Sequence, residues 1–113
     1  MTNFAHGRAA EDAAAEYLKK HGYMILDLNW RTRYCEIDIV AQQKKTIYFV
    51  EVKYRENDAH GSGLEYITEK KLQQMRFAAE MWVQENDWRG DYDIVAIEVS
   101  GPGYDVTSFT TNF

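Results

Sequence analysis

The sequence predicts a single α/β domain over residues 1–113, with a mixed β-sheet flanked by helices in the order α-β-β-β-α-β-β. Three observations lead to this fold class. The length of 113 residues fits one domain. Apolar residues make up 45% of the chain, as in a packed globule. Several strands followed by a helix and another strand imply a mixed sheet with helices beside it.

The first half of the chain predicts a helix and three strands. Residues 3–21 are rich in Ala, Glu and Lys and stop at Gly22, which is typical of a helix and its C-terminal glycine. Residues 23–29 alternate loosely and predict the first strand, and residues 34–41 alternate better. Residues 46–54 are almost continuously apolar, which indicates a central strand covered on both faces.

The second half predicts a loop, a helix and two more strands. Residues 57–63 are expected to form the loop, and Thr68 is a suitable N-cap for a helix that ends near Asn86. The apolar stripe of this helix consists of Leu72, Met75, Ala79 and Trp82. Residues 92–99 and 104–110 predict the last strands, joined by a Gly-Pro-Gly turn.

An acid and a base stand two residues apart near the end of the central strand. Because side chains two apart in a strand share a face, Glu51 and Lys53 project together. One interpretation is an ion pair at an exposed strand end. The other is a metal ligand beside a lysine that orients or activates water.

A second pair of carboxylates lies in the strand expected over residues 34–41. Its alternation predicts two faces, Ile37, Ile39 and Ala41 on one side and Glu36, Asp38 and Val40 on the other. A polar turn at residues 42–45 makes this strand antiparallel to the next, so we expect Asp38 near Glu51. Close carboxylates repel unless a cation lies between them or one keeps its proton, and hard oxygen ligands suit Mg²⁺ or Mn²⁺. A solvated strand edge is the alternative.

The first helix supplies a third carboxylate. At 100° per residue, Glu11 lies near the line of Leu18, which is expected to pack on the sheet. An acid facing inward is costly without a partner, although a glutamate at the helix edge can reach water instead. Three carboxylates and Lys53 arriving from a helix and two strands would suit metal-assisted hydrolysis of a phosphodiester.

The charge balance counts against a nucleic-acid partner without excluding one. The chain has 13 basic and 18 acidic residues, a net charge of −5, whereas DNA-binding domains are usually basic. Local sign matters more than the sum. The cations that can gather on one face are Arg31, Arg33, Lys53, Arg55, Lys70 and Lys71. We expect Arg31, Arg33 and Arg55 to hold backbone phosphate, with a plain solvated face as the alternative.

The sequence favours a cytoplasmic protein that is not embedded in a membrane. Cys35 is the only cysteine, which excludes an intrachain disulfide and suits a reducing compartment. Residues 1–8 have no apolar stretch resembling a signal peptide. No apolar run approaches the roughly 18 residues that a transmembrane helix needs.

An ordered set of short motifs spans nearly the whole chain and resembles the YraN-like proteins, a bacterial family of uncharacterised function. The motifs are Gly7-Arg8-Ala9-Ala10-Glu11, Tyr17-Leu18, Gly22-Tyr23, Asn29-Trp30-Arg31, Glu36-Ile37-Asp38, Phe49-Val50-Glu51-Val52-Lys53-Tyr54-Arg55, Ile67-Thr68 with Lys71, and Tyr92-Asp93-Ile94-Val95. Each motif is weak alone, but the ordered set is specific.

The resemblance implies a restriction-endonuclease-like fold of the PD-(D/E)XK superfamily, similar to archaeal Holliday-junction resolvases. Asp38 and Glu51 would then bind Mg²⁺ or Mn²⁺, Lys53 would be the catalytic lysine and Glu11 the helix acid. Lys71 matches a position that can reach phosphate. The expected function is DNA endonuclease activity, on branched or damaged DNA, and the resolvases suggest a homodimer.

Two positions depart from the pattern of the family. Ala10 and Cys35 stand where the family usually has glycine, and both place a side chain where backbone or substrate would approach closely. The alternative is therefore a catalytically weak or inactive domain that binds nucleic acid or protein on a nuclease-like scaffold.

Overall fold

The elements follow the order that the sequence predicts. The computed structural model describes residues 3–56, 67–111 and 113. Its helices and strands are α1 (Asn3–Lys20), β1 (Met24–Arg31), β2 (Glu36–Gln43), β3 (Thr46–Arg55), α2 (Glu69–Glu85), β4 (Asp91–Ser100) and β5 (Asp105–Thr110). The loop expected over residues 57–63 lies outside the described residues. The predicted α/β fold with the order α-β-β-β-α-β-β is confirmed.

Both helices end where their local sequence dictates. At the end of α1, Gly22 has φ 87°, and the Tyr23 N–H donates to Leu18 O at 2.9 Å. This left-handed glycine satisfies the last carbonyls of the helix, as a C-terminal glycine commonly does. At the start of α2, Thr68 Oγ1 accepts the N–H of Lys71 at 3.1 Å, which confirms the predicted N-cap.

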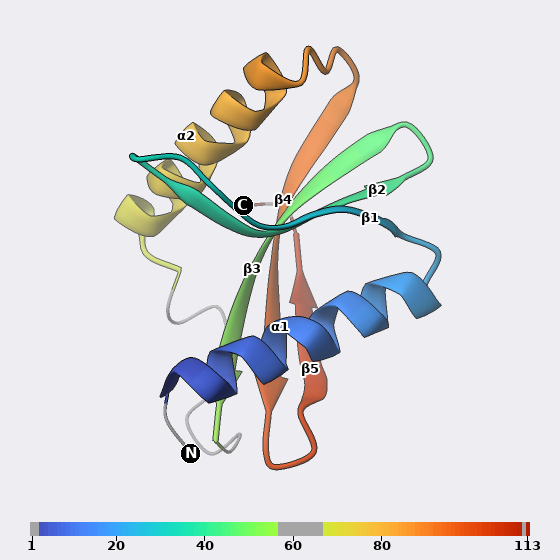
Figure 1. Cartoon of the computed structure of the whole chain (residues 1–113), viewed down its shortest axis with the longest axis vertical. Helices are drawn as coiled ribbons and strands as arrows, with labels where there is room; N and C mark the ends of the chain where they lie inside the picture. Colours follow the sequence, from blue (N-terminus) through green and yellow to red (C-terminus); the bar gives the residue numbers. More distant parts are fainter. Residues whose placement is uncertain (1–2, 57–66, 112) are drawn as a thin grey trace.

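The strands form one mixed sheet in the order β1-β2-β3-β4-β5. β1, β2 and β3 pair antiparallel, β3 and β4 pair parallel, and β4 and β5 pair antiparallel. A parallel pair needs a crossover, which the chain makes through α2. Figure 1 shows α1 crossing the sheet and the turn between β1 and β2 reaching toward α2.

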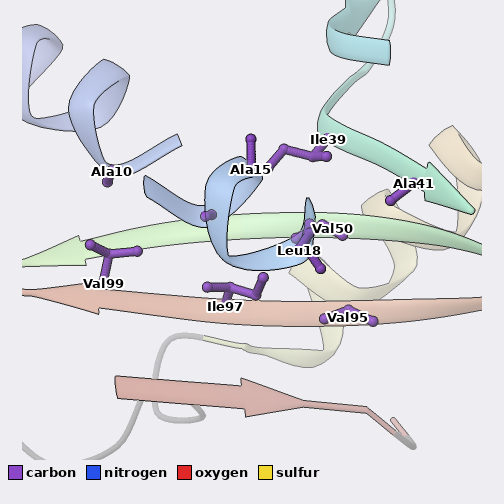
Figure 2. Close-up of a cluster of buried hydrophobic side chains, with 10 residues drawn as sticks. Ala10, Ala15, Leu18, Ile39, Ala41, Val50, Val95, Ile97 and Val99 are labelled. Carbon is purple, nitrogen blue, oxygen red and sulfur yellow. The ribbon is translucent and has the colours of Figure 1, made fainter. Parts of the chain in front are cut away.

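Each helix packs on its own face of the sheet. Under α1, Leu18 packs with Val50 and Ile97, as Figure 2 shows. Under α2, Trp82 packs with Phe49. Because consecutive residues of β3 enter different cores, this strand is covered on both faces, as its apolar run predicts. Within the described residues, no helix has the length and apolar character needed to cross a membrane.

The expected alternation of β2 is wrong at one point. Ile39 and Ala41 belong to the core under α1, but Ile37 packs under α2. The reversal occurs at Asp38, which lies opposite Asn29 because Leu28 pairs with Ile39 and Trp30 with Ile37. Asn29 has φ 53°, a left-handed conformation that asparagine tolerates better than most residues.

Candidate active site

Asp38 lies where β2 separates from β3. The ladder between these strands runs as far as the pair Ile39–Val50. At the next residue, the carboxylate of Asp38 replaces a backbone acceptor of the ladder, because its Oδ2 accepts the N–H of Val52 at 2.8 Å. A side chain therefore satisfies a backbone donor where the strands diverge. This bond fixes the half-buried carboxylate at the split between the two strands.

The carboxylate of Asp38 is poised to lose or keep its proton near neutral pH. Burial and then the negative charge of Glu51 raise the pKa of Asp38 to about 7, and the charges of Glu11 and Glu36 act in the same direction. The N–H of Val52 opposes them and lowers the pKa. Asp38 and Glu51 thus lie close enough, as expected, for their negative charges to repel each other. A bound cation would relieve this repulsion.

Glu51 has a partner that the sequence analysis missed. Lys71 Nζ lies 2.9 Å from Glu51 Oε1, in an ion pair between α2 and β3. Burial lowers the pKa of Lys71, but the bond to Glu51 and the nearby negative charges prevail and raise it. We expected Lys71 to reach phosphate, and the structure instead places its ammonium on a candidate metal ligand. The sequence signal for this ion pair was the N-cap at Thr68, because the start of α2 determines which turn of the helix faces the end of the sheet.

Glu11 reaches the same region from α1. Burial raises its pKa, a hydrogen bond from the Asn29 side chain lowers it, and the charges of Glu36, Asp12 and Glu51 raise it. Glu11, Asn29 and Asp38 border a groove of about 400 Å³ between α1 and the β1–β2 hairpin. Sequence reasoning missed Asn29, although an asparagine inside a strand pattern was a local signal of unusual backbone conformation.

Lys53 and Arg55 extend the same face of β3 beyond Glu51. The side chain of Lys53 is exposed. Arg55 Nε lies 2.6 Å from Glu98 Oε2, and these side chains are 18% and 3% exposed. The structure thus gives Arg55 a partner inside the protein, which differs from the phosphate contact expected of it. The sequence signal for this pair was Glu98 itself, an acid placed among apolar residues of its strand.

Arg31 and Arg33 lie at the tip of the β1–β2 hairpin. Arg31 Nη2 is 3.8 Å from Glu36 Oε2, in a well-exposed pair of small energetic weight. The guanidinium of Arg33 lies 5.7 Å from the centre of the Tyr34 ring. Both arginines therefore remain at a surface that a nucleic acid can approach.

A second and larger groove opens on the other side of the hairpin. It holds about 750 Å³ between the hairpin tip and α2, and Glu51 borders it. Arg31 and Glu36 border both grooves. Asp38 thus borders the groove beside α1, and Glu51 borders the groove beside α2. The two candidate ligands therefore lie between two accessible surfaces.

The donor set fits a hard divalent cation, although it is not a complete cage. Asp38, Glu51 and Glu11 offer carboxylate oxygens, which Mg²⁺ and Mn²⁺ prefer. Within residues 3–56, 67–111 and 113, no three carboxylate, imidazole or thiol groups are arranged to hold one ion together. Mg²⁺ commonly keeps waters and binds one or two carboxylates with substrate phosphates. The site suits that mode, provided that Glu51 exchanges Lys71 for the ion.

Comparison with known proteins places the chain in a family. Residues 10–97 match the model of the uncharacterised protein family UPF0102. The chain belongs to the UPF0102 family. A UPF0102 protein of Vibrio parahaemolyticus is 40% identical over 101 residues, covering 84% of this chain and 82% of the relative. A UPF0102 protein of Rhodococcus opacus is 40% identical over 104 residues, covering 88% of each chain.

A third UPF0102 protein, from a Sulfurihydrogenibium strain, is 41% identical over 101 residues, covering 87% of this chain and 88% of the relative. The resemblance to the YraN-like proteins is thus confirmed as membership of this family. The matched residues 10–97 include the helix acid Glu11, Asp38, Glu51 and Lys53. The names of these relatives state no activity, so the function of the UPF0102 site has to be argued from its chemistry.

Proposed function

We propose that this UPF0102 protein is a Mg²⁺- or Mn²⁺-dependent endonuclease that hydrolyses phosphodiester bonds in DNA. The observation that carries the proposal is the pairing of Asp38 and Glu51 at the split between β2 and β3. Burial and then the charge of Glu51 raise the pKa of Asp38 to about 7, and Asp38 borders a groove of about 400 Å³. Two neighbouring carboxylates of like charge beside an exposed lysine are a costly arrangement for a purely structural strand end.

The residues have separate roles in the proposed reaction. Asp38, held by the N–H of Val52, and Glu51 would bind the cation. The bound cation supplies polarisation of the scissile phosphate and a lower pKa for the attacking water. Lys53, two residues beyond Glu51 on the same strand, would orient the water or stabilise the developing negative charge. Glu11 would hold a second water or a hydrated ion from the side of α1.

Lys71 changes partner in this scheme. Without the cation, its ammonium neutralises Glu51. When Glu51 binds the cation, Lys71 is released at the edge of the 750 Å³ groove, where its charge can hold a substrate phosphate. The family resemblance implies a contact between Lys71 and phosphate. In this scheme, that contact forms only after the cation binds.

The substrate and assembly are further parts of the proposal. Branched or damaged DNA is proposed because of the resemblance to junction resolvases, which is an argument by analogy. A homodimer is proposed for the same reason, since two symmetric centres suit two cuts in a four-way junction. The free thiol of Cys35 agrees with a cytoplasmic location.

A second function is a binding domain without catalysis. The ion pair between Lys71 and Glu51 favours it, because a lysine already occupies the position that a cation would need. Ala10 and Cys35 add side chains where the family usually has glycine. In this case the grooves would bind DNA or a protein, and Asp38→Asn would leave that binding unchanged.

Cleavage of a labelled four-way junction with Mn²⁺ tests the proposal. We expect cutting that EDTA abolishes and that falls by at least roughly 100-fold in Lys53→Ala and Asp38→Asn. Lys20→Ala, which removes an exposed lysine at the end of α1, is the matched control and should cut normally. Absence of cutting across junction, duplex and single-stranded DNA by the folded protein would favour the binding domain.

A further inference from the structure

We infer that the groove between the β1–β2 hairpin and α2 binds an unpaired, single-stranded segment of nucleic acid. This inference rests on the proposed function, because the groove leads to Glu51. It goes further by naming the substrate class. The α2 side of the groove carries cations and amides, both walls carry an aromatic ring, and the carboxylate of Glu51 is part of the lining.

Two aromatic rings are left in water on opposite walls of the groove. Tyr34, on the hairpin, is 73% exposed, and Phe77, on α2, is 48% exposed. Neither belongs to the buried clusters formed by the described residues. Phe77 lies off the buried stripe of α2, so the core does not require an aromatic ring there. Burying a Phe side chain is worth about 1.5–3 kcal/mol, which this position forgoes.

The cations around the groove are placed against the local electrostatics. Lys70 and Lys71 lie in the first turn of α2, where the helix dipole favours anions and disfavours lysine. Arg31 lines the facing wall, and Arg33 lies above the Tyr34 ring. The lining also holds Glu36 and Glu51, which pair with Arg31 and Lys71. Its cations still outnumber its carboxylates, three to two, in a chain with a net charge of −5, and this local balance favours a polyanion.

The aromatic rings decide which polyanion fits. Bases in a duplex are stacked inside it and offer no free face, whereas unpaired bases can stack on a protein ring. Tyr34 and Phe77 can each take one base face, while Lys70 and Arg31 hold the intervening phosphates. The amides of Gln73 and Gln74, on the α2 side, can bond to base edges without demanding one sequence. A strand lying in this groove delivers its phosphate to Glu51.

Fluorescence anisotropy tests the inference without any cutting. The full-length protein is titrated, in EDTA, into a labelled single-stranded oligonucleotide and into the duplex of the same sequence. We expect tighter binding of the single strand. We expect Tyr34→Ala and Phe77→Ala each to weaken it by roughly 5- to 100-fold, the range measured for loss of one stacked base. Tyr34→Phe should retain binding, because it keeps the ring.

Charge and control variants separate a phosphate contact from a structural effect. Lys70→Gln should lower the salt dependence of binding by about 0.7 in the log–log slope, which is the contribution of one phosphate on a single strand. Leu28→Ala removes a side chain that is 51% exposed on β1, outside the groove, and should bind like the wild type. Matching DNA and RNA oligonucleotides tell which sugar the groove accepts, and binding of either supports the inference.

The two proposals fail in different ways. Asp38→Asn should bind the single strand normally in EDTA, because Asp38 does not line this groove. Binding of the single strand by the wild-type protein without any cleavage in Mn²⁺ supports the groove and counts only against the nuclease. Equal binding of the Tyr34→Ala, Phe77→Ala and wild-type proteins would overturn the inference. So would a preference for the duplex, or absence of binding to either form by a protein whose thermal unfolding is normal.

Discussion

Lys71 Nζ lies 2.9 Å from Glu51 Oε1, so a lysine of α2 holds one of the two carboxylates that we propose as metal ligands. A cation and this ammonium compete for the same oxygen. We therefore expect Lys71→Met to raise the affinity for Mn²⁺ by up to roughly fivefold, since a partly exposed ion pair is worth up to about 1 kcal/mol. Titration of free Mn²⁺ by electron paramagnetic resonance measures this affinity.

The neighbouring lysine provides the control for this experiment. Lys70 lies in the same turn of α2 and is exposed. Lys70→Met removes the same charge without releasing Glu51, so it should change the Mn²⁺ affinity by less than Lys71→Met does. Equal affinities of the two variants would show that the ion pair does not compete with the cation.

Asp38 predicts an unusual dependence of stability on pH. Its pKa is about 7 in the folded protein and 3.8 as its ordinary value. Between these values the folded state keeps a proton that the unfolded state has lost, so this group makes folding less favourable as pH rises through that window. Below the window both states are protonated, and above it the penalty is constant.

Asp38→Asn should remove this penalty, because the amide is neutral and its oxygen can still accept the N–H of Val52. We expect the variant to melt above the wild type, with a difference in Tm that grows by roughly 10 °C between about pH 5 and about pH 8. Differential scanning calorimetry across this range measures it. A constant difference would place the titrating group elsewhere.

The same carboxylate links metal binding to pH. A proton on Asp38 competes with the cation, so Mg²⁺ should raise the Tm of the wild type more at about pH 8 than at about pH 6. At 100 times its dissociation constant, a ligand adds about 2.7 kcal/mol of stability. Asp38→Asn should show little effect of Mg²⁺ at either pH, and a large effect in that variant would move the ion to another site.

The buried pair of Arg55 and Glu98 carries a prediction about stability alone. Arg55→Met leaves the Glu98 carboxylate, which is 3% exposed, without its cation. Losing one partner of a buried ion pair typically costs about 3–5 kcal/mol. The control is Arg89→Met, which breaks the exposed pair with Asp87 at 3.3 Å and should cost less than about 0.5 kcal/mol. Urea unfolding compares the two variants, and similar losses would contradict a buried role for Arg55.

Most of the fold could be predicted from the sequence, because the local sequence signals agree with the packing of the helices and strands. The cap at Thr68, the stop at Gly22 and the apolar run of residues 46–54 each depend on a few neighbouring residues, and each is found as expected. The order of the elements then leaves few arrangements for the sheet.

The site was harder to predict because it depends on contacts between distant segments. The ion pair of Lys71 with Glu51 joins α2 to β3, and that of Arg55 with Glu98 joins two strands separated by a helix. The spacing of these residues along the chain does not predict either ion pair. The reversal of β2 at Asp38 was also missed, and it lies opposite the left-handed Asn29 of the facing strand.

Asn29 carries a prediction about stability. Its φ of 53° is tolerated by asparagine and glycine but costs most other residues about 1–2 kcal/mol. Its side chain also bonds to Glu11. Asn29→Gly should keep the reversed alternation and lose only this bond, which is worth about 1 kcal/mol. Asn29→Ala should lose the bond and add backbone strain, so urea unfolding should rank the wild type above Gly and Gly above Ala. Equal stabilities of the Gly and Ala variants would show that the left-handed backbone at Asn29 adds no strain to an alanine.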